Sequence, residues 1–160
     1  MFSLFKKTSL VHPLLGQINY ARDTWQGNSA HIFACENVAI KLPGTKDGPD
    51  TAALQALLSL QSSYATQQIQ LAEILFHQHY VHGKAAYDAG EFVEAGADYP
   101  EIKTADEIWP YLHLLSVRIS QEKNDYRIEL IFSADWDIEH QLGFSFVNNS
   151  LQEFCASVGP

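Results

Sequence analysis

Three segments in the last third of the chain alternate apolar and polar residues with a period of two. The apolar positions are Leu115, Val117 and Ile119, then Tyr126, Ile128, Leu130 and Phe132, then Leu142, Phe144 and Phe146. A period of two gives each segment one apolar face, as a half-buried strand requires. The pattern predicts three consecutive strands, with the first turn at residues 121–125. A last turn at Asn148-Asn149 should lead to a fourth strand, residues 151–158, at a sheet edge.

Short strands also open the chain. They cover residues 17–21, 29–34 and 38–42, with breaks at Gly27-Asn28 and Glu36-Asn37. Strands of this length, separated only by turn residues, pair antiparallel with their neighbours. We therefore expect an N-terminal antiparallel meander.

The middle of the chain carries a helical pattern. Leucines and a glutamine form one face and later apolar residues another: Leu54, Leu57, Leu58 and Gln61, then Ile69, Ala72, Phe76 and Tyr80. Pro49 suits the first turn, because its missing N–H is not needed there, and Asp50 adds favourable charge at the helix start. The two faces are offset, which predicts one long helix or two in series with a bend or break near Ser62-Ser63. Gly83 is the expected stop.

Residues 84–103 show no clean period and predict an irregular connection. After them, Thr104 and Glu107 have the spacing of a capping box, in which a hydroxyl and a carboxylate satisfy free backbone N–H groups. A short helix should follow and be stopped or distorted at Pro110. Strands, then helix, then strands predict a single α+β domain over residues 1–160. Its mainly antiparallel sheet should carry one long or broken helix and a short helix on one face.

Length and charge limit the function classes. Of the 160 residues 46% are apolar, which is enough for one core, and no cofactor is expected. Nineteen acids against ten bases give a net charge of −9, which repels phosphate backbones and disfavours nucleic-acid binding. Neither a membrane span nor a signal peptide is recognisable, so we expect a cytoplasmic protein that does not contact membranes. Cys35 and Cys155 are expected to be reduced and buried.

A chemically rich segment, residues 135–140, lies between the second and third of the final strands and reads Asp-Trp-Asp-Ile-Glu-His. Its three acids follow the first half of a calcium loop. The match then fails, because the sixth and twelfth positions of that loop require Gly and Glu, whereas this chain has His140 and Phe146. The segment is therefore not an EF-hand.

Three interpretations of this segment remain open. A transition metal would use His140 with one or two of the carboxylates of Asp135, Asp137 and Glu139, plus another histidine from elsewhere in the fold. A ligand or partner protein would contact Trp136, Asp137, Glu139 and His140. In a purely structural interpretation, Asp135 or Asp137 caps the turn, Trp136 packs onto the sheet, and Glu139 pairs with His140 on the surface.

Histidines on the helix offer a second candidate for metal binding, and their spacing argues against it. Metal-binding helices place two histidines four residues apart, on one face. Here His77 and His79 lie on nearly opposite sides, and only His79 and His82 share a face. A solvated or partly buried helix end is expected here. The sequence has no nucleophile elbow and no Gly-rich phosphate loop, so it predicts no catalytic residue.

The sequence from Trp136 to Gly143 reads Trp-Asp-Ile-Glu-His-Gln-Leu-Gly. It resembles a family of small bacterial cytoplasmic proteins of unknown function that carry a C-terminal Trp-Asp-x-Glu-His-Gly-Leu-Gly motif, from which it departs at Gln141. A Trp-x-Gly at residues 25–27 and Glu-Ile-Trp at residues 107–109 appear in the same order, so the resemblance covers most of the chain. The resemblance implies no established activity. Similar small acidic α+β proteins act as immunity proteins that neutralise toxins.

Charge and resemblance together favour a non-enzymatic protein-interaction module, with an immunity protein against a basic toxin as the specific hypothesis. The alternative is a metal- or ligand-dependent, hydrolase-like enzyme that uses residues 135–140, with Glu139 and His140 as ligands or acid–base groups. A third alternative is a homodimer in which the last strand, residues 151–158, pairs with a second copy.

Overall fold

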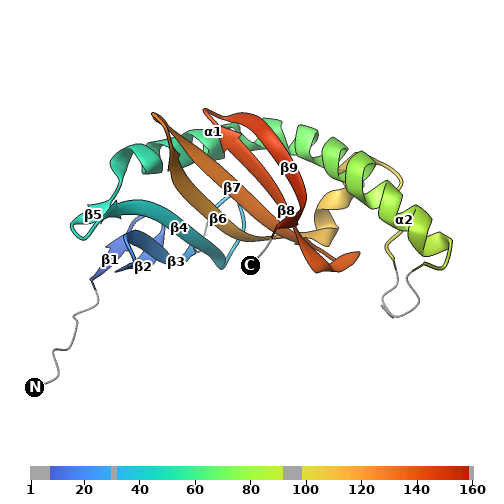
Figure 1. Cartoon of the computed structure of the whole chain (residues 1–160), viewed down its shortest axis with the longest axis horizontal. Helices are drawn as coiled ribbons and strands as arrows, with labels where there is room; N and C mark the ends of the chain where they lie inside the picture. The colour runs from blue at the N-terminus through green and yellow to red at the C-terminus, as the bar shows by residue number, and fades with distance from the viewer. Residues whose placement is uncertain (1–7, 30–31, 92–98, 159–160) are drawn as a thin grey trace, which may run out of the picture.

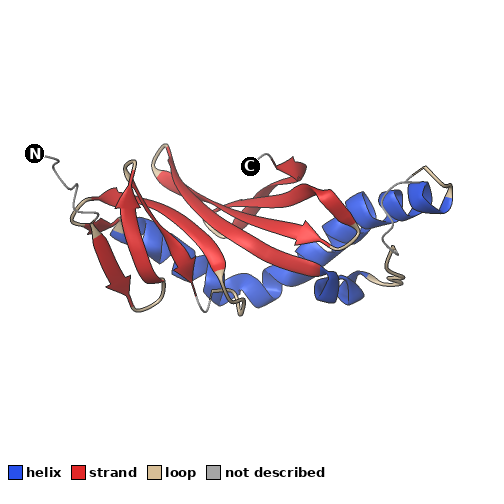
Figure 2. Cartoon of the chain, turned by 90° about the horizontal axis from the view of Figure 1, so that it is seen from below, coloured by secondary structure: helices blue, strands red, loops and turns tan. Residues whose placement is uncertain are grey.

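The computed structural model describes residues 8–29, 32–91 and 99–158, which form one sheet against one long helix. The helix runs behind the sheet along the length of the molecule (Figure 1), and a view turned by 90° shows strands on one side and helix on the other (Figure 2). The strands are β1 (Ser9–His12), β2 (Gly16–Ala21), β3 (Thr24–Ser29), β4 (Val38–Thr45), β5 (Gly48–Pro49), β6 (Leu112–Glu122), β7 (Asp125–Ala134), β8 (Asp137–Val147) and β9 (Ser150–Val158).

The sheet consists of two antiparallel meanders. Strands β1 to β4 pair in chain order, and so do strands β6 to β9. The short strand β5 folds back on β4. The meanders meet where β4 and β6 pair in parallel. A parallel pair needs a crossover connection, and the long helix supplies it. The result is a mostly antiparallel sheet with one long helix, as an α+β class predicts.

The helix is continuous from Thr51 to Asp88. It comprises α1 (Thr51–Leu75), a π-helical turn η1 (Phe76–Tyr80) and α2 (Val81–Asp88). Asp50 caps its start, because the carboxylate accepts hydrogen bonds from two backbone N–H groups of the first turn, at 2.8 and 3.2 Å. The helix that connects β4 to β6 therefore begins at a defined, capped residue.

The predicted break at Ser62-Ser63 is wrong. Both hydroxyls donate to carbonyls of the preceding helical turn, so the serines stay within the helix. The irregularity lies instead at η1, which adds a residue to one turn and shifts the face that follows. The predicted stop at Gly83 is also wrong, since α2 continues to Asp88 and Gly90 is the residue with positive φ (77°) beyond its end.

The N-terminal meander is confirmed, but its middle strand lies earlier than predicted. Strand β3 is Thr24–Ser29 and contains the expected break at Gly27-Asn28. A Cβ at Gly27 would lie 2.5 Å from the carbonyl oxygen of Gln17, so glycine here allows β2 and β3 to approach closely. Of the predicted strand at 29–34, residues 30–31 lie outside the described residues, and the part from Ile32 on is a tight turn with a bridge between Ile32 and Cys35.

The connection from the helix to β6 differs in part from the prediction. Residues 84–88 are helical rather than irregular, and residues 92–98 lie outside the described residues. A 3₁₀ helix, η2 (Ala105–Tyr111), follows with Pro110 inside it. The capping box is wrong, because the Thr104 side chain caps nothing and Glu107 accepts from the backbone N–H of Lys103 at 2.8 Å.

The C-terminal strands are confirmed, but Leu115 was wrongly placed on the apolar face: a register shift between Leu114 and Ser116 of β6 leaves Leu114 buried and Leu115 36% exposed. Strands β6, β7 and β8 follow one another, Asn148 and Asn149 turn the chain with φ of 51° and 60°, and β9 forms the sheet edge. One apolar core fills the space between sheet and helix, with Trp25, Leu57, Leu71, Ile108, Phe144 and Phe146 among its fully buried members. Within the described residues, no helix is apolar over a length that could cross a membrane.

Both cysteines are free, but they are not both buried as predicted. Cys35 is half-buried and Cys155 is exposed on β9. The difference arises because β9 has one face toward the core and one toward solvent, and Cys155 lies on the solvent side next to Phe154, which packs against the core.

Candidate functional site

The hairpin between β7 and β8 contains a bulge of several residues in β8. Ala134 pairs with Asp137 around a two-residue turn, and the next pair along the ladder is Phe132 with Leu142. Residues 138–141 of β8 therefore lie opposite a single residue of β7. Extra residues on one strand bend it away from its partner and re-aim its side chains. We call residues 138–141 the β8 bulge.

The side chain of Asp137 closes the β8 bulge. Its Oδ1 accepts a hydrogen bond from the backbone N–H of His140 at 3.1 Å and lies 3.0 Å from Nδ1 of the same histidine. An ionised carboxylate only accepts hydrogen bonds, so Nδ1 of His140 carries a proton. In a neutral His140 the second ring nitrogen, Nε2, is then the unprotonated one. The first residue of β8 thus holds both ends of the bulge together.

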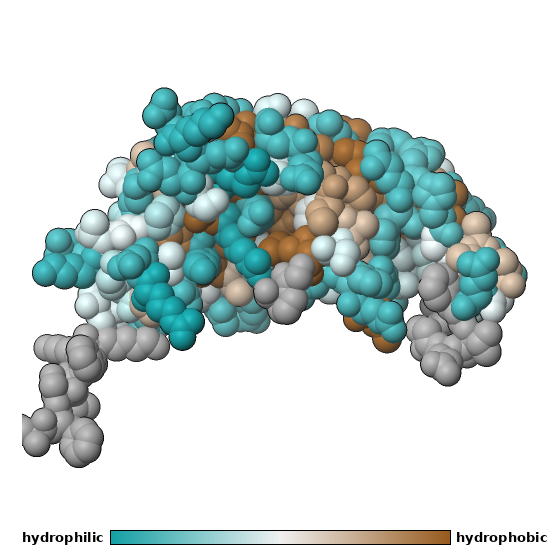
Figure 3. Space-filling model, viewed as in Figure 1, coloured by the Kyte–Doolittle hydropathy of each residue, from teal (hydrophilic) through white to brown (hydrophobic). Residues whose placement is uncertain are grey.

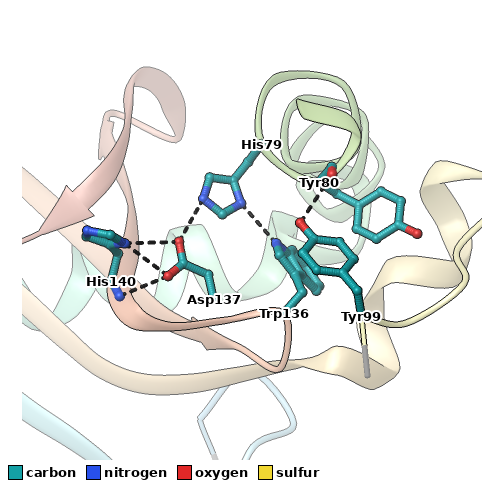
Figure 4. Close-up of polar contacts among 6 residues, drawn as sticks. All are labelled: His79, Tyr80, Tyr99, Trp136, Asp137 and His140. Carbon is teal, nitrogen blue, oxygen red and sulfur yellow. Dashed lines mark hydrogen bonds and ion pairs between the residues drawn. The ribbon is translucent and has the colours of Figure 1, made fainter. Parts of the chain in front are cut away.

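His79 on the helix connects Asp137 to Trp136. The Nε2 of His79 lies 3.1 Å from Oδ2 of Asp137, and its Nδ1 accepts a hydrogen bond from the indole N–H of Trp136 at 3.0 Å (Figure 4). The side chains of His79 and Asp137 are only 14% and 18% exposed. The hairpin is therefore tied to the helix by a hydrogen-bonded chain that runs from Trp136 through His79 and Asp137 to His140. We call these four side chains the anchor network.

The π-helical turn places His79 in this position. A π-turn contains an extra residue, so the residues within it do not follow the regular 100° spacing of an α-helix. His79 and Tyr80 both turn toward the hairpin, whereas His77 stays exposed and lies 3.2 Å from the Glu73 carboxylate. The earlier expectation of a solvated or partly buried helix end therefore fits His77 but misses the role of His79.

Aromatic packing supports the anchor network from the side of the helix. The ring of Tyr80 meets Trp136 edge to face at 5.5 Å, and its hydroxyl donates to the carbonyl of Pro100 at 2.6 Å. Tyr99 lies over Gly83, where a Cβ would collide with the tyrosine hydroxyl. Gly83 is thus required for close approach of Tyr99 rather than for ending the helix.

The hydrogen bonds fix the protonation state of His79. An indole N–H can only donate, so Nδ1 of His79 must be the unprotonated nitrogen, and the proton on Nε2 donates to Asp137. Burial lowers the pKa of His79 below the usual histidine value, outweighing the opposite effect of the Asp137 carboxylate. A second proton would sit on Nδ1 and face the Trp136 N–H, which would break the network.

This arrangement predicts a pH-dependent stability. In acid, the unfolded chain takes up a proton at His79 near pH ~6.5 while the folded chain does not, so the free energy of unfolding falls as the pH drops below that value until the folded pKa is reached. NMR titration of the His79 ring should give a midpoint below ~6.5. The His79→Gln variant, which keeps one acceptor and one donor, should lose this part of the pH dependence. A His79 midpoint above ~6.5 would contradict the assignment.

The β8 bulge displays side chains that the anchor network does not use. Ile138 is 74% exposed, and Glu139 and His140 are also exposed. In the part of the chain that the structure describes, the carboxylate of Glu139 has no ion pair or hydrogen-bond partner. An apolar side chain and an acid are thus both exposed in a bulge whose backbone is held at His140 by Asp137.

Comparison with known families gives a match over most of the chain. The model of a domain of unknown function, DUF6985, matches residues 14–157. The chain belongs to this family. No curated protein and no solved structure matches it. The match extends from before β2 into β9, so the long helix, the anchor network and the β8 bulge are all parts of the DUF6985 domain.

The DUF6985 domain brings three of the predicted site residues together. Trp136, Asp137 and His140 all belong to the anchor network. Glu139 lies outside the network and does not pair with His140 as the structural interpretation expected, because Asp137 occupies that imidazole. Asp135 points elsewhere and lies 2.9 Å from Nε2 of His113. Among the described residues, no three His, Cys, Asp or Glu side chains are arranged to hold a metal ion.

His79 is the residue that sequence reasoning missed in the DUF6985 domain. It lies 57 residues from its partner Trp136 in the sequence, and helical spacing gave it no partner. The signal that could have found it is chemical. A buried tryptophan in a turn needs an acceptor for its indole N–H, and the unprotonated nitrogen of a neutral histidine can supply one.

Proposed function

We propose that this DUF6985 domain is a non-enzymatic, cytoplasmic interaction module that binds a protein partner through the β8 bulge. The observation that carries this proposal is that the hairpin contains two kinds of side chain, those bonded within the fold and those that are exposed and have no bond to the described residues. The side chains of Trp136, Asp137 and His79 are occupied in holding the bulge, whereas Ile138 and Glu139 project from it without a structural task. A rigid, exposed apolar residue beside a charge is typical of a protein-contact loop.

The charge of the chain supports a basic partner. The net charge is −9, and exposed acids lie within the bulge at Glu139 and in the turn before it at Asp135. An acidic surface attracts a basic protein at long range and raises the association rate. Binding of this kind would suit an immunity protein that blocks a basic toxin, and we propose that role as the specific form of the interaction.

One observation favours the enzymatic alternative. The Asp137 carboxylate orients His140 with Nδ1 protonated, which leaves Nε2 at the surface, as a general base requires. A nucleophilic or hydrolytic reaction also needs a second group beside that nitrogen. Among the described residues, no hydroxyl or thiol is hydrogen-bonded to His140, and no metal-ligand set includes it. The Asp137–His140 pair is used to close the bulge, and this makes the interaction role the better supported one.

Reversing the charge of Glu139 should slow partner association. Immobilised wild-type chain is used to capture a protein from lysate of the source cells, and association rates are then measured with the purified partner. At low salt the Glu139→Lys variant should associate about tenfold more slowly, and the difference should shrink as salt screens the charges. Asp47→Lys makes the same change of charge in the turn between β4 and β5, far from the bulge (Figure 1). It should change the rate less than about twofold. Equal effects of the two variants, or no captured partner at any salt concentration, would contradict the proposal.

The edge strand β9 keeps the homodimer alternative open as a further proposal. One side of β9 pairs with β8 and the other side is the edge of the sheet. A backbone edge of this kind can pair with a second copy. Such a dimer would leave the β8 bulge free, so it is compatible with the interaction role.

A further inference from the structure

The face of the sheet that points away from the helix carries one continuous polar row. Following the strand register from β2 to β9, the residues of this row are Asn19, Gln26, Lys41, Arg118, Glu129, Ser145 and Glu153. Figure 3 looks onto this open face and shows hydrophilic surface across it, with hydrophobic patches between. The row is unusual in an acidic protein because two adjacent positions, the third and the fourth, are both basic.

Lys41 and Arg118 are direct neighbours across the parallel junction of β4 and β6. Like charges directly opposite each other on one sheet face are destabilising. Among the described residues neither side chain has an ion pair. Arg127 on the same face shows the contrast, since it lies 2.6 Å from the Glu122 carboxylate and donates to the Ser145 hydroxyl at 2.8 Å. Neither cation is thus held in an ion pair of the kind that holds Arg127, although Glu129 lies opposite Arg118 on its other side.

A groove of about 430 Å³ lies over this pair of cations. Small side chains create the space, because the residues two positions before Lys41 and Arg118, on the same face of the sheet, are Ala39 and Ser116. Amide side chains close the groove on the side of β2 and β3. Its polar lining consists of Asn19, Gln26, Asn28, Lys41, Ser116 and Arg118.

We propose that this groove binds a small ligand through an anionic oxygen group, a phosphate or a carboxylate. Arg118 offers a planar set of donors that matches two oxygens of such a group, and Lys41 adds a second positive charge. The amides and the Ser116 hydroxyl can pair with further polar groups of the ligand. The volume lies in the range of small-molecule sites. The bound anion would also relieve the repulsion between the two cations.

Thermal unfolding in the presence of anions tests the proposal. The probes are sodium phosphate and sodium citrate, each compared with sodium chloride at equal ionic strength. Phosphate, citrate or both should raise the melting temperature of the wild-type chain by about 5 °C or more at about 100 times Kd. A response to phosphate alone assigns a phosphate ligand, and a response to citrate alone assigns a carboxylate ligand. NMR should show the shift at the Arg118 Nε–H and the Gln26 side-chain amide.

Variants of the two cations test whether the anion binds in the groove. Arg118→Gln and Lys41→Gln should each weaken binding about tenfold or more, because each removes a charge-assisted contact. Both should fold normally, since each removes one of two repelling charges. Lys103→Gln, an exposed lysine before η2, should leave the response unchanged. The proposal is overturned if neither anion raises the melting temperature above the chloride control, or if the rise is equal in wild type and both groove variants.

Discussion

Replacing Trp136 with alanine is expected to lower the free energy of unfolding by about 3–5 kcal/mol. Trp136 is only 8% exposed, although it sits in a two-residue turn. Its ring packs edge to face on Tyr80, and its N–H donates to His79 at 3.0 Å. The substitution removes the ring from the core and leaves a half-buried imidazole nitrogen without a donor. Equilibrium unfolding in urea at neutral pH measures the loss.

Two variants separate the parts of this effect. Trp136→Phe keeps most of the apolar ring but removes the N–H, so it should cost about 1–3 kcal/mol, as expected for an unsatisfied buried acceptor. Trp109→Ala serves as the matched control, because Trp109 is half-buried at the end of a helix and makes no bond to the anchor network. Its loss should be smaller than that of Trp136→Ala. An equal or smaller loss for Trp136→Ala would show that the hairpin is not anchored through this ring.

The strands of the C-terminal half could be predicted from the sequence because their signal is local. In β6 and β7 the apolar side chains fall at every second position from Val117 to Ile119 and from Ile128 to Phe132, and all of these are buried. Asn148 and Asn149 tolerate the positive φ of a tight hairpin turn, and both adopt it. Period and turn chemistry therefore sufficed for these elements.

The anchor network could be predicted only in part. Residues 136–140 stood out by composition, and Trp136 is the structural anchor that its size and position suggested. His79 could not be assigned, because its role depends on a π-helical turn and on a contact between segments 57 residues apart. The β8 bulge was also hidden, since a strand pattern does not show how many residues lie opposite each position of its partner.

The family resemblance now has a physical explanation in this chain. Within the motif, Trp136 anchors the turn, Asp137 closes the bulge, and Leu142 returns the strand to the core. Gly143 leaves room for Val158 of β9, whose side chain occupies the place of a Cβ. Gln141 takes part in the pairing of β8 with β9, so a glycine is not needed at that position here. The motif residues thus fix the shape from which Ile138 and Glu139 project.

Replacing Ile138 with aspartate is expected to weaken partner binding about 30-fold or more, because a central apolar contact of an interface carries about 2 kcal/mol or more. The same change should leave stability within about 0.5 kcal/mol of wild type, since Ile138 is 74% exposed. Ile69 on the helix provides a matched control. It is the same residue type and 70% exposed, but it lies outside the hairpin.

The ratio of the two dissociation constants tests the role of the β8 bulge most directly. It is measured with the purified partner protein against the Ile138→Asp and Ile69→Asp variants, after urea unfolding has shown both to be folded. We predict that Ile138→Asp binds at least about 30 times more weakly than Ile69→Asp, which should bind as wild type does. Equal affinities of the two variants would contradict the assignment of the bulge as the binding surface.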